Sequence, residues 1–309
     1  MSSGEGVIWA VRDAIFQPER DRKTGEVTEV KVDNGVEDKR LFIGQTEFAQ
    51  ALKVMSRDTN ILSMVLRDAW DSGDLRTLVK NSPARATNAH ISVVGHITEE
   101  ELKRELNECD MFNGFANRFI WLVAQRSRFL PDGGVLPKEF VRLAFDLKNI
   151  VEKAKNIGEM KRDGEARAHW HQIYSELSSE GNGMLGAATS RAEAQVLRIS
   201  MLYALADASP IIQLPHLKAA LALWNYSAAS AKCLFGGRLA DVNAQKILEA
   251  LRSHPQGMTR KQILDEVFNR NISKEALALA FKNLQSVKGI SKEIKETGGR
   301  PLERWFFKI

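Results

Sequence analysis

Positive charge in this chain is concentrated near its C-terminus. Residues 240–309 contain 13 lysines and arginines against 8 acidic residues, whereas the remaining residues contain 31 of each sign. Clustered lysine and arginine side chains neutralise backbone phosphates and release counterions, which supplies most of the non-specific affinity of proteins for DNA. The charge distribution therefore predicts a phosphate-binding surface in this segment. A solvated basic tail without a binding role is the alternative.

Other reactive side chains do not have the spacing of a catalytic or metal site. His169 and His171 are two positions apart, so on a helix their rings point roughly 200° apart and cannot share a metal ion. Cys109 and Cys233 are distant and lack metal-ligand spacing, which favours two reduced structural thiols. No Gly-x-Ser-x-Gly motif is present. We therefore expect no resident metal ion.

Length and composition are those of a folded protein with more than one domain. The chain has 309 residues, of which 44% are apolar and 27% charged. No run of about 18 apolar residues exists, and the N-terminus has neither a basic leader nor a small-residue cleavage site. We therefore expect a cytoplasmic protein that does not associate with membranes.

The first 135 residues alternate strand and helix patterns, which predicts an α/β layer. Strands are predicted at residues 27–32, 40–43, 75–79, 91–94 and 118–123. Helices are predicted at residues 6–15, 48–55 and 60–70. Residues 136–237 carry long amphipathic patterns instead, at 140–156, 162–177, 191–206 and 214–234. This second part is expected to be a helical bundle.

Residues 240–309 have the pattern of a third, separate domain. Helices are predicted at residues 242–253, 259–267 and 273–286, followed by two extended stretches at 290–294 and 303–307. Three helices and a hairpin in this order are typical of a winged helix-turn-helix. We expect Trp305 and Phe307 to fill its core. The fold expected for the whole chain is therefore α/β plus α, with a C-terminal winged helix.

The third helix of such a domain enters the major groove of DNA, and the hairpin rests on the backbone. The DNA-binding candidates on that helix are Ser273, Lys274, Lys282 and Asn283, and Arg300 lies at the glycine-rich tip of the hairpin. A winged helix that binds another protein is the alternative.

Segments in the same order along the chain resemble a known family. They include residues 2–6, 40–48 (RLFIGQTEF), 60–90, 91–96 (ISVVGH), 113–119 (NGFANRF) and 190–200 (SRAEAQVLRIS). Together they resemble the AAA+ core of minichromosome-maintenance-type helicases. The resemblance is closer to the helicase-like domain of phage, plasmid and integrated-element replication proteins of the primase-helicase type. It implies an AAA+-like core at 1–135, a helical lid at 136–237 and the winged helix at 240–309.

The resemblance implies roles for four residues in ATP chemistry. Glu47 corresponds to the acidic end of the Walker B strand, which holds magnesium and polarises the attacking water. His96 takes the place of the sensor that reads the γ-phosphate, although a histidine at a strand end is often structural. Arg118 matches an arginine finger that completes the site of a neighbouring subunit. Arg191 matches the lid arginine, for which a structural salt bridge is the alternative.

The resemblance also implies a DNA channel and a set of partners. Lys80, Asn81 and Arg85 lie in the region that carries a pore hairpin toward DNA in the family. Its members act as rings, so a homo-oligomer ring is one expected assembly. A complex with an N-terminal partner subunit is the other.

One departure from the family pattern concerns the phosphate-binding loop. The motif G-x-x-x-x-G-K-[ST] is absent, and the sequence contains no Gly-Lys dipeptide. Without that loop nothing holds the β- and γ-phosphates. ATP and Mg²⁺ are therefore expected as ligands only if an upstream segment or a partner supplies the loop. The alternative is a non-enzymatic DNA-binding initiator, or a regulatory remnant of a mobile element.

Overall fold

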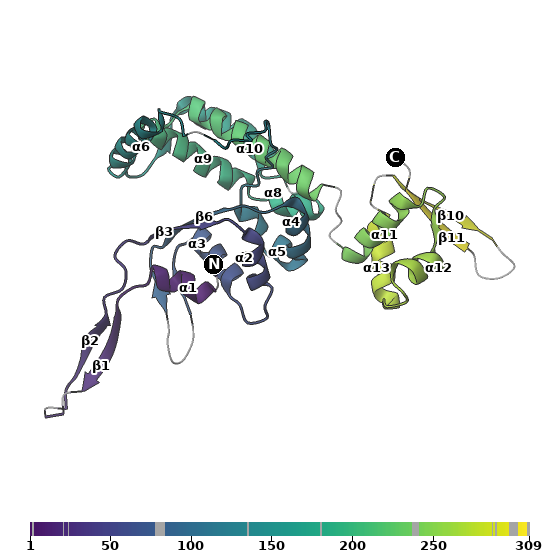
Figure 1. Cartoon of the computed structure of the whole chain (residues 1–309), viewed down its shortest axis with the longest axis horizontal. Helices are drawn as coiled ribbons and strands as arrows, with labels where there is room; N and C mark the ends of the chain where they lie inside the picture. The colour runs from purple at the N-terminus through teal and green to yellow at the C-terminus, as the bar shows by residue number, and fades with distance from the viewer. Residues whose placement is uncertain are drawn as a thin grey trace. The chain divides into compact units, whose positions relative to one another are not determined.

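The chain folds into two compact units of mixed α/β structure with small sheets, as the alternating patterns predicted (Figure 1). The computed structural model describes residues 1, 3–20, 22–23, 25–77, 84–134, 136–179, 181–236, 241–285, 287, 289–296 and 302–307. Unit 1 comprises Met1–Gly181 and Gly186–Leu234, and unit 2 comprises Asn182–Leu185 and Phe235–Ile309.

The centre of unit 1 is a parallel pair of strands, β3 (Arg40–Gln45) and β6 (His90–Gly95). Two helices, α2 (Phe48–Met55) and α3 (Leu62–Asp71), lie between them in sequence. The apolar spacing of α2 buries Phe48, Leu52 and Met55, which is why this segment forms an amphipathic helix. The strand predicted at 75–79 is the short β4 (Leu75–Arg76), which pairs with β5 (Arg85–Ala86).

A hairpin arm, which the sequence analysis only half predicted, projects from unit 1 (Figure 1). It consists of β1 (Ile15–Arg20) paired with β2 (Val27–Asp33), and nearly all its side chains are exposed. The prediction of a helix at 6–15 was too long, because α1 (Gly4–Ala10) ends before the arm begins. Pro18 and three charged or amide side chains hide the strand pattern of β1.

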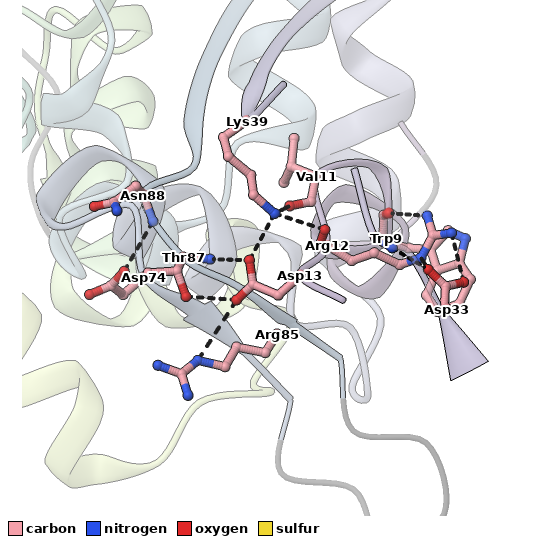
Figure 2. A network of polar contacts seen from close by, with 11 residues as sticks. Trp9, Val11, Arg12, Asp13, Asp33, Lys39, Asp74, Arg85, Thr87 and Asn88 are labelled. Atoms are coloured by element: carbon pink, nitrogen blue, oxygen red, sulfur yellow. Dashed lines mark hydrogen bonds and ion pairs between the residues drawn. The ribbon is translucent and has the colours of Figure 1, made fainter. Parts of the chain in front are cut away.

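The base of the arm is fixed by a network of polar contacts that Figure 2 shows in detail. The Lys39 ammonium donates to the carbonyls of Val11 (3.0 Å) and Arg12 (2.8 Å) and to the Asp13 carboxylate (2.8 Å). Asp13 also accepts from the amide of Thr87 (3.1 Å) and from its hydroxyl (2.6 Å). One lysine and one carboxylate thus connect the end of α1, the start of β3 and the turn before β6.

The helical part of unit 1 follows a segment, residues 119–125, that has no helix or strand assigned. Helices α4 (Glu99–Glu105) and α5 (Glu108–Phe112) and the 3₁₀ turn η1 (Ala116–Arg118) precede that segment. Arg118 belongs to η1, and residues 119–125 have no helix or strand assigned and join no sheet in the described part of the chain, so the strand predicted at 118–123 is not formed. The later elements are α6 (Phe140–Ala154), β7 (Lys161–Arg162), α7 (Gly164–Leu177), α8 (Gly183–Thr189), α9 (Ala192–Ala206), β8 (Ile211–Ile212) and α10 (Leu214–Phe235).

Helices α7, α9 and α10 share one apolar core. It contains Ala166 and Trp170 from α7, Val196 and Ile199 from α9, and Leu217, Ala220 and Trp224 from α10. The predicted helix at 191–206 therefore matches α9 closely because its inward face is continuous. Within the described residues, none of the helices has the length and apolar character needed to span a bilayer.

Unit 2 consists of three helical segments and a three-stranded antiparallel sheet. Its helices are α11 (Val242–Ser253), α12 (Arg260–Gln262) with the π-helical turn η2 (Ile263–Val267), and α13 (Lys274–Leu284). The strands β9 (Met258–Thr259), β10 (Ile290–Lys295) and β11 (Leu302–Phe307) run in the order β10-β11-β9. Asp241, Thr259 and Ser273 cap the helices as N-cap acceptors.

The core of unit 2 is built around one aromatic pair. Trp305 is 2% exposed and stacks on Phe281 with ring centroids 4.7 Å apart. The prediction that Trp305 fills the core is confirmed, and Phe307 packs against the same cluster.

The contacts of Lys39 predict a stability effect. In a Lys39→Met variant two carbonyls and Asp13 each lose the hydrogen bond from the lysine, and Asp13 also loses its nearest cation, so the free energy of unfolding of unit 1 should fall by about 1–3 kcal/mol. Chemical denaturation followed by fluorescence measures this, with Lys31→Met, on the exposed face of β2, as the control. Equal stability of the two variants would contradict the role given to Lys39.

The same network gives a pH dependence. Burial raises the pKa of Asp13, but hydrogen bonds from Lys39 and Thr87 outweigh it and hold the pKa below its ordinary 3.8. The stabilisation from this carboxylate is therefore complete above pH 3.8 and is lost as the pH falls below that value. The difference in stability between the wild type and Lys39→Met should shrink in the same range.

Candidate functional site

The ends of β3 and β6 bring two of the predicted site residues together. The amide of Phe48 donates to the carbonyl of His96 (2.8 Å), and the amide of His96 donates to the carbonyl of Gln45 (3.0 Å). Glu47 and His96 therefore follow adjacent parallel strands at the same sheet end, which is where α/β sheets bind ligands. Both side chains are exposed, and the Glu47 carboxylate accepts from the Gln50 amide at 2.8 Å.

A second group, which we call the arginine cluster, surrounds the end of α3. It consists of Arg118, Arg191 and Arg198 around Trp70 and Asp71. The guanidinium carbons lie 3.5 Å (Arg198), 4.8 Å (Arg191) and 5.5 Å (Arg118) from the centroid of the Trp70 ring. All three guanidinium groups therefore lie close enough to the Trp70 ring for a cation–π interaction.

Asp71 is the carboxylate that pairs with two arginines of this cluster. Arg118 forms an ion pair with it and also donates to the carbonyl of Gly114. Arg191 Nη1 lies 3.4 Å from the other Asp71 oxygen. Arg198 donates to the carbonyl of Trp70 (2.8 Å) but has no ion-pair partner in the described part of the chain.

Separate segments position these side chains. Trp70 and Asp71 end α3, Arg118 ends η1, and Arg191 immediately precedes α9. Arg198 lies seven positions after Arg191, two helical turns further along, so both reach the same side of α9. The side-chain amide of Asn117 also donates to the Ser190 hydroxyl (2.8 Å), and this hydrogen bond fixes η1 against the start of α9.

The cluster carries more positive than negative charge. Burial lowers the pKa of Arg198; Asp71 opposes this fall, whereas Arg191 and Arg118 add to it. Arg118 has only 8% of its side chain exposed, and its Nε is buried without a hydrogen-bond partner in the described residues. Unmatched guanidinium donors of this kind are suited to an anion with several oxygens, such as a phosphate group.

A cavity of about 950 Å³ adjoins both places. Its lining includes His96 at the end of β6 and Trp70 and Arg118 of the arginine cluster. Apolar side chains from α3, β6 and residues 119–125 form most of the wall. Ligand sites commonly combine an apolar wall with a few converging polar groups.

The four residues assigned to ATP chemistry therefore fall in two pairs, Glu47 with His96 and Arg118 with Arg191. Sequence reasoning missed Trp70, Asp71 and Arg198 as members of the site. For Arg198 a signal was available, since it lies seven residues after Arg191 on one predicted helix and therefore on the same helix face.

The candidates for DNA contact have different surroundings. Lys274 and Lys282 are exposed on α13, whereas Asn283 is partly buried and donates to the Asp241 carboxylate at 2.9 Å. Arg85 is exposed on β5, with its Nε 3.9 Å from Asp13. The candidates Lys80, Asn81 and Arg300 lie outside the described residues.

No protein-family model matches the chain, and no curated protein matches its sequence. What the chain does must therefore be inferred from the chemistry of these residues.

The arginine cluster predicts a rescue by anions. Asp71→Asn removes the carboxylate and leaves Arg118 buried without its charge partner, so stability should fall by about 1–3 kcal/mol. Inorganic pyrophosphate should then raise the melting temperature of this variant more than that of the wild type. Asp68→Asn, an exposed aspartate on the same helix, is the control. An Asp71→Asn variant as stable as this control, with no added response to pyrophosphate, would argue against the cluster.

Proposed function

We propose that the chain is a DNA-binding replication protein that carries the rear part of a helicase-like ATPase of the primase-helicase type. In this proposal unit 1 is an AAA+-like core with its helical lid, and unit 2 is a winged-helix domain. The supporting observation is the convergence of Arg118 and Arg191, from segments over 70 residues apart, on the single carboxylate of Asp71. The family resemblance assigned both to ATP, Arg118 as a finger for the site of a neighbouring subunit and Arg191 as the lid arginine.

The arginine cluster would bind the phosphate oxygens of ATP. Its guanidiniums are held by Trp70 and Asp71 before any ligand arrives, so little reorganisation is needed. Arg118 could serve a neighbouring subunit only by leaving Asp71 when a ring assembles. Glu47 would orient the attacking water and His96 would contact the γ-phosphate, both from strand ends next to the cavity.

ATP hydrolysis by this proposal depends on a phosphate-binding loop from an upstream segment or a partner subunit. The sequence has no Gly-Lys dipeptide, so its own residues cannot make the usual loop and lysine. Within the described residues no group of three or more histidine, cysteine or acidic side chains gathers to hold a metal. Mg²⁺ would therefore bind mainly through the phosphates and the completing segment, with Glu47 as the contribution of this chain.

DNA binding is assigned to unit 2. It has three helical segments followed by the β10–β11 hairpin, and the excess positive charge of the sequence lies in residues 240–309. Lys274 and Lys282 on α13 would contact the DNA backbone or base edges. Asn283 is better explained as a structural partner of the α11 cap, since its amide is bonded to Asp241.

A non-enzymatic DNA-binding initiator, or a regulatory remnant of a mobile element, is the second candidate. It is favoured by the missing phosphate loop and by Glu47 being the only acidic residue in residues 40–48. In that case the AAA+-like fold would serve as a scaffold. The two candidates agree on DNA binding and differ on nucleotide chemistry.

Our proposal predicts that the purified chain alone binds ATP weakly and does not hydrolyse it. Mixing it with an upstream segment that carries a phosphate loop should create ATPase activity. Arg118→Ala should then reduce turnover by roughly 10³-fold or more, the scale of arginine fingers. A steady-state phosphate-release assay measures both. DNA-stimulated turnover by the chain alone, above that of Glu47→Gln, would overturn the requirement for a supplied loop.

For DNA, deletion of residues 241–309 should remove most of the duplex affinity. Lys282→Ala and Lys274→Ala should each weaken binding and reduce the salt dependence of log Kd by about one unit of slope if the lysine contacts phosphate. Fluorescence anisotropy over a range of salt concentrations gives both quantities. Lys148→Ala, on α6 of unit 1, is the charge-matched control. If the truncated chain binds duplex as tightly as the intact one, unit 2 is not the DNA-binding domain.

A further inference from the structure

We propose that strand β2 of the hairpin arm is a pairing surface for a second copy of the chain. Two arms would join antiparallel along their β2 strands, about a two-fold axis at Val30, and would form one continuous sheet. The contact needs neither ATP nor DNA and goes beyond the proposed function. It lies on the arm that projects from unit 1 (Figure 1).

The two edges of the arm differ in whether they can accept another strand. Among the described residues the arm is a sheet of two strands, so β1 and β2 each pair on one side only. Pro18 lies within β1, and its ring and missing N–H oppose strand addition at that edge. β2 contains no proline, and valine or threonine, which favour strands, occupies four of its seven positions. The open edge is therefore that of β2.

Pro18 also determines which main-chain groups of β2 face this open edge. It lies opposite Glu29 in the β1–β2 ladder. Because proline cannot donate, we place it in a pair whose main-chain groups point away from each other. The amide and carbonyl of Glu29 then face the open edge, and by the alternation along a strand so do those of Lys31. The groups of Val30, between them, face β1.

The charges on the open edge favour a second copy as the partner. Glu29 and Lys31 lie on either side of Val30, so an antiparallel pair centred on Val30 places Glu29 of each copy opposite Lys31 of the other. Both side chains are exposed, and neither has an ion-pair partner in the described part of the chain. A parallel pair in register would instead bring like charges together.

The hydrogen-bond register agrees with the charges. In an antiparallel ladder, residues exchange hydrogen bonds only where the main-chain groups of both face the shared edge. A pair centred on Val30 joins Glu29 of one copy with Lys31 of the other, and both have groups that face outward. A shift by one residue would oppose an outward-facing residue to one whose groups face β1. The same register thus satisfies both the side chains and the main chain.

A protective role for these charges is the alternative, since charged side chains on an edge strand often prevent association. Charges of one sign serve that role best, because they repel in every register. Glu29 and Lys31 have opposite signs and attract in the antiparallel register described above. Joining two arms would also stabilise each of them, because a two-stranded hairpin is marginally stable alone.

Charge reversal in the full chain tests the partner. Glu29→Lys and Lys31→Glu each place like charges opposite each other on both sides of the axis, so each should weaken self-association by about tenfold or more. An equal mixture of the two variants restores opposite charges and should associate within about threefold of the wild type. Sedimentation velocity over a wide range of protein concentrations measures this. Glu19→Lys, an exposed position on β1, is the matched control and should associate normally.

Disulfide cross-linking tests the register. In a background of Cys109→Ser and Cys233→Ser, the Val30→Cys variant places two thiols opposite each other at the axis, with Cα atoms about 4.5 Å apart. Oxidised glutathione should then produce a covalent dimer. Thr28→Cys is the control, because its two copies would lie four residues apart along the ladder, about 13 Å, which is too far for a disulfide.

Three results would overturn the proposal. A chain that stays monomeric at every concentration does not pair through its arm. Self-association that neither charge reversal weakens uses another surface. If the two reversed variants do not associate with each other, or if Thr28→Cys cross-links as readily as Val30→Cys, the pair is not centred on Val30. None of these assays contains nucleotide or DNA, so their failure is distinct from failure of the proposed function.

Discussion

The ion pairs of Asp71 are the contacts on which the candidate site depends. This carboxylate receives Arg118 from the segment after α5 and Arg191 from the start of α9, while Arg198 lies over the adjacent Trp70. It therefore joins the α/β part of unit 1 to its helical part. Because two arginines share this carboxylate and Arg198 lies beside it, the positive charge of the cluster is only partly compensated, which favours the binding of an added anion. The ion pairs that join the two parts of unit 1 are thus also part of the candidate anion-binding site.

The sequence predicted the elements whose information is local, and it failed where pairing depends on distant segments. Helices α2 and α11 have the predicted bounds because amphipathic spacing and capping residues are encoded within each segment. A strand was predicted at residues 118–123, but Arg118 ends η1 and residues 119–123 join no sheet in the described chain. The apolar pattern of that segment is encoded locally, but a hydrogen-bonded partner is not.

The same difference between local patterns and contacts of distant segments applies to the site residues. Glu47 and His96 could be placed from the sequence because each follows the end of a predicted strand, and parallel strands end at one edge of a sheet. Trp70 and Asp71 could not, because nothing in residues 62–71 indicates that three arginines from other segments converge there. The position of Asn283 on the predicted recognition helix suggested DNA, whereas its hydrogen bond to Asp241, the cap of α11, could not be predicted from the local pattern.

One edge of β6 and the arginine cluster lie at the same cavity. In a buried parallel sheet each inner strand has neighbours on both edges, and among the described residues β6 has one neighbour. The cavity that this leaves reaches from the free edge of β6 to Arg118 and Trp70, so a single inserted segment would touch both the sheet and the cluster. If that segment also carried phosphate-binding groups, the anion that balances the arginines would be held by the chain that completes the sheet. Sheet completion and nucleotide binding would then be thermodynamically linked, and each would strengthen the other by the same factor.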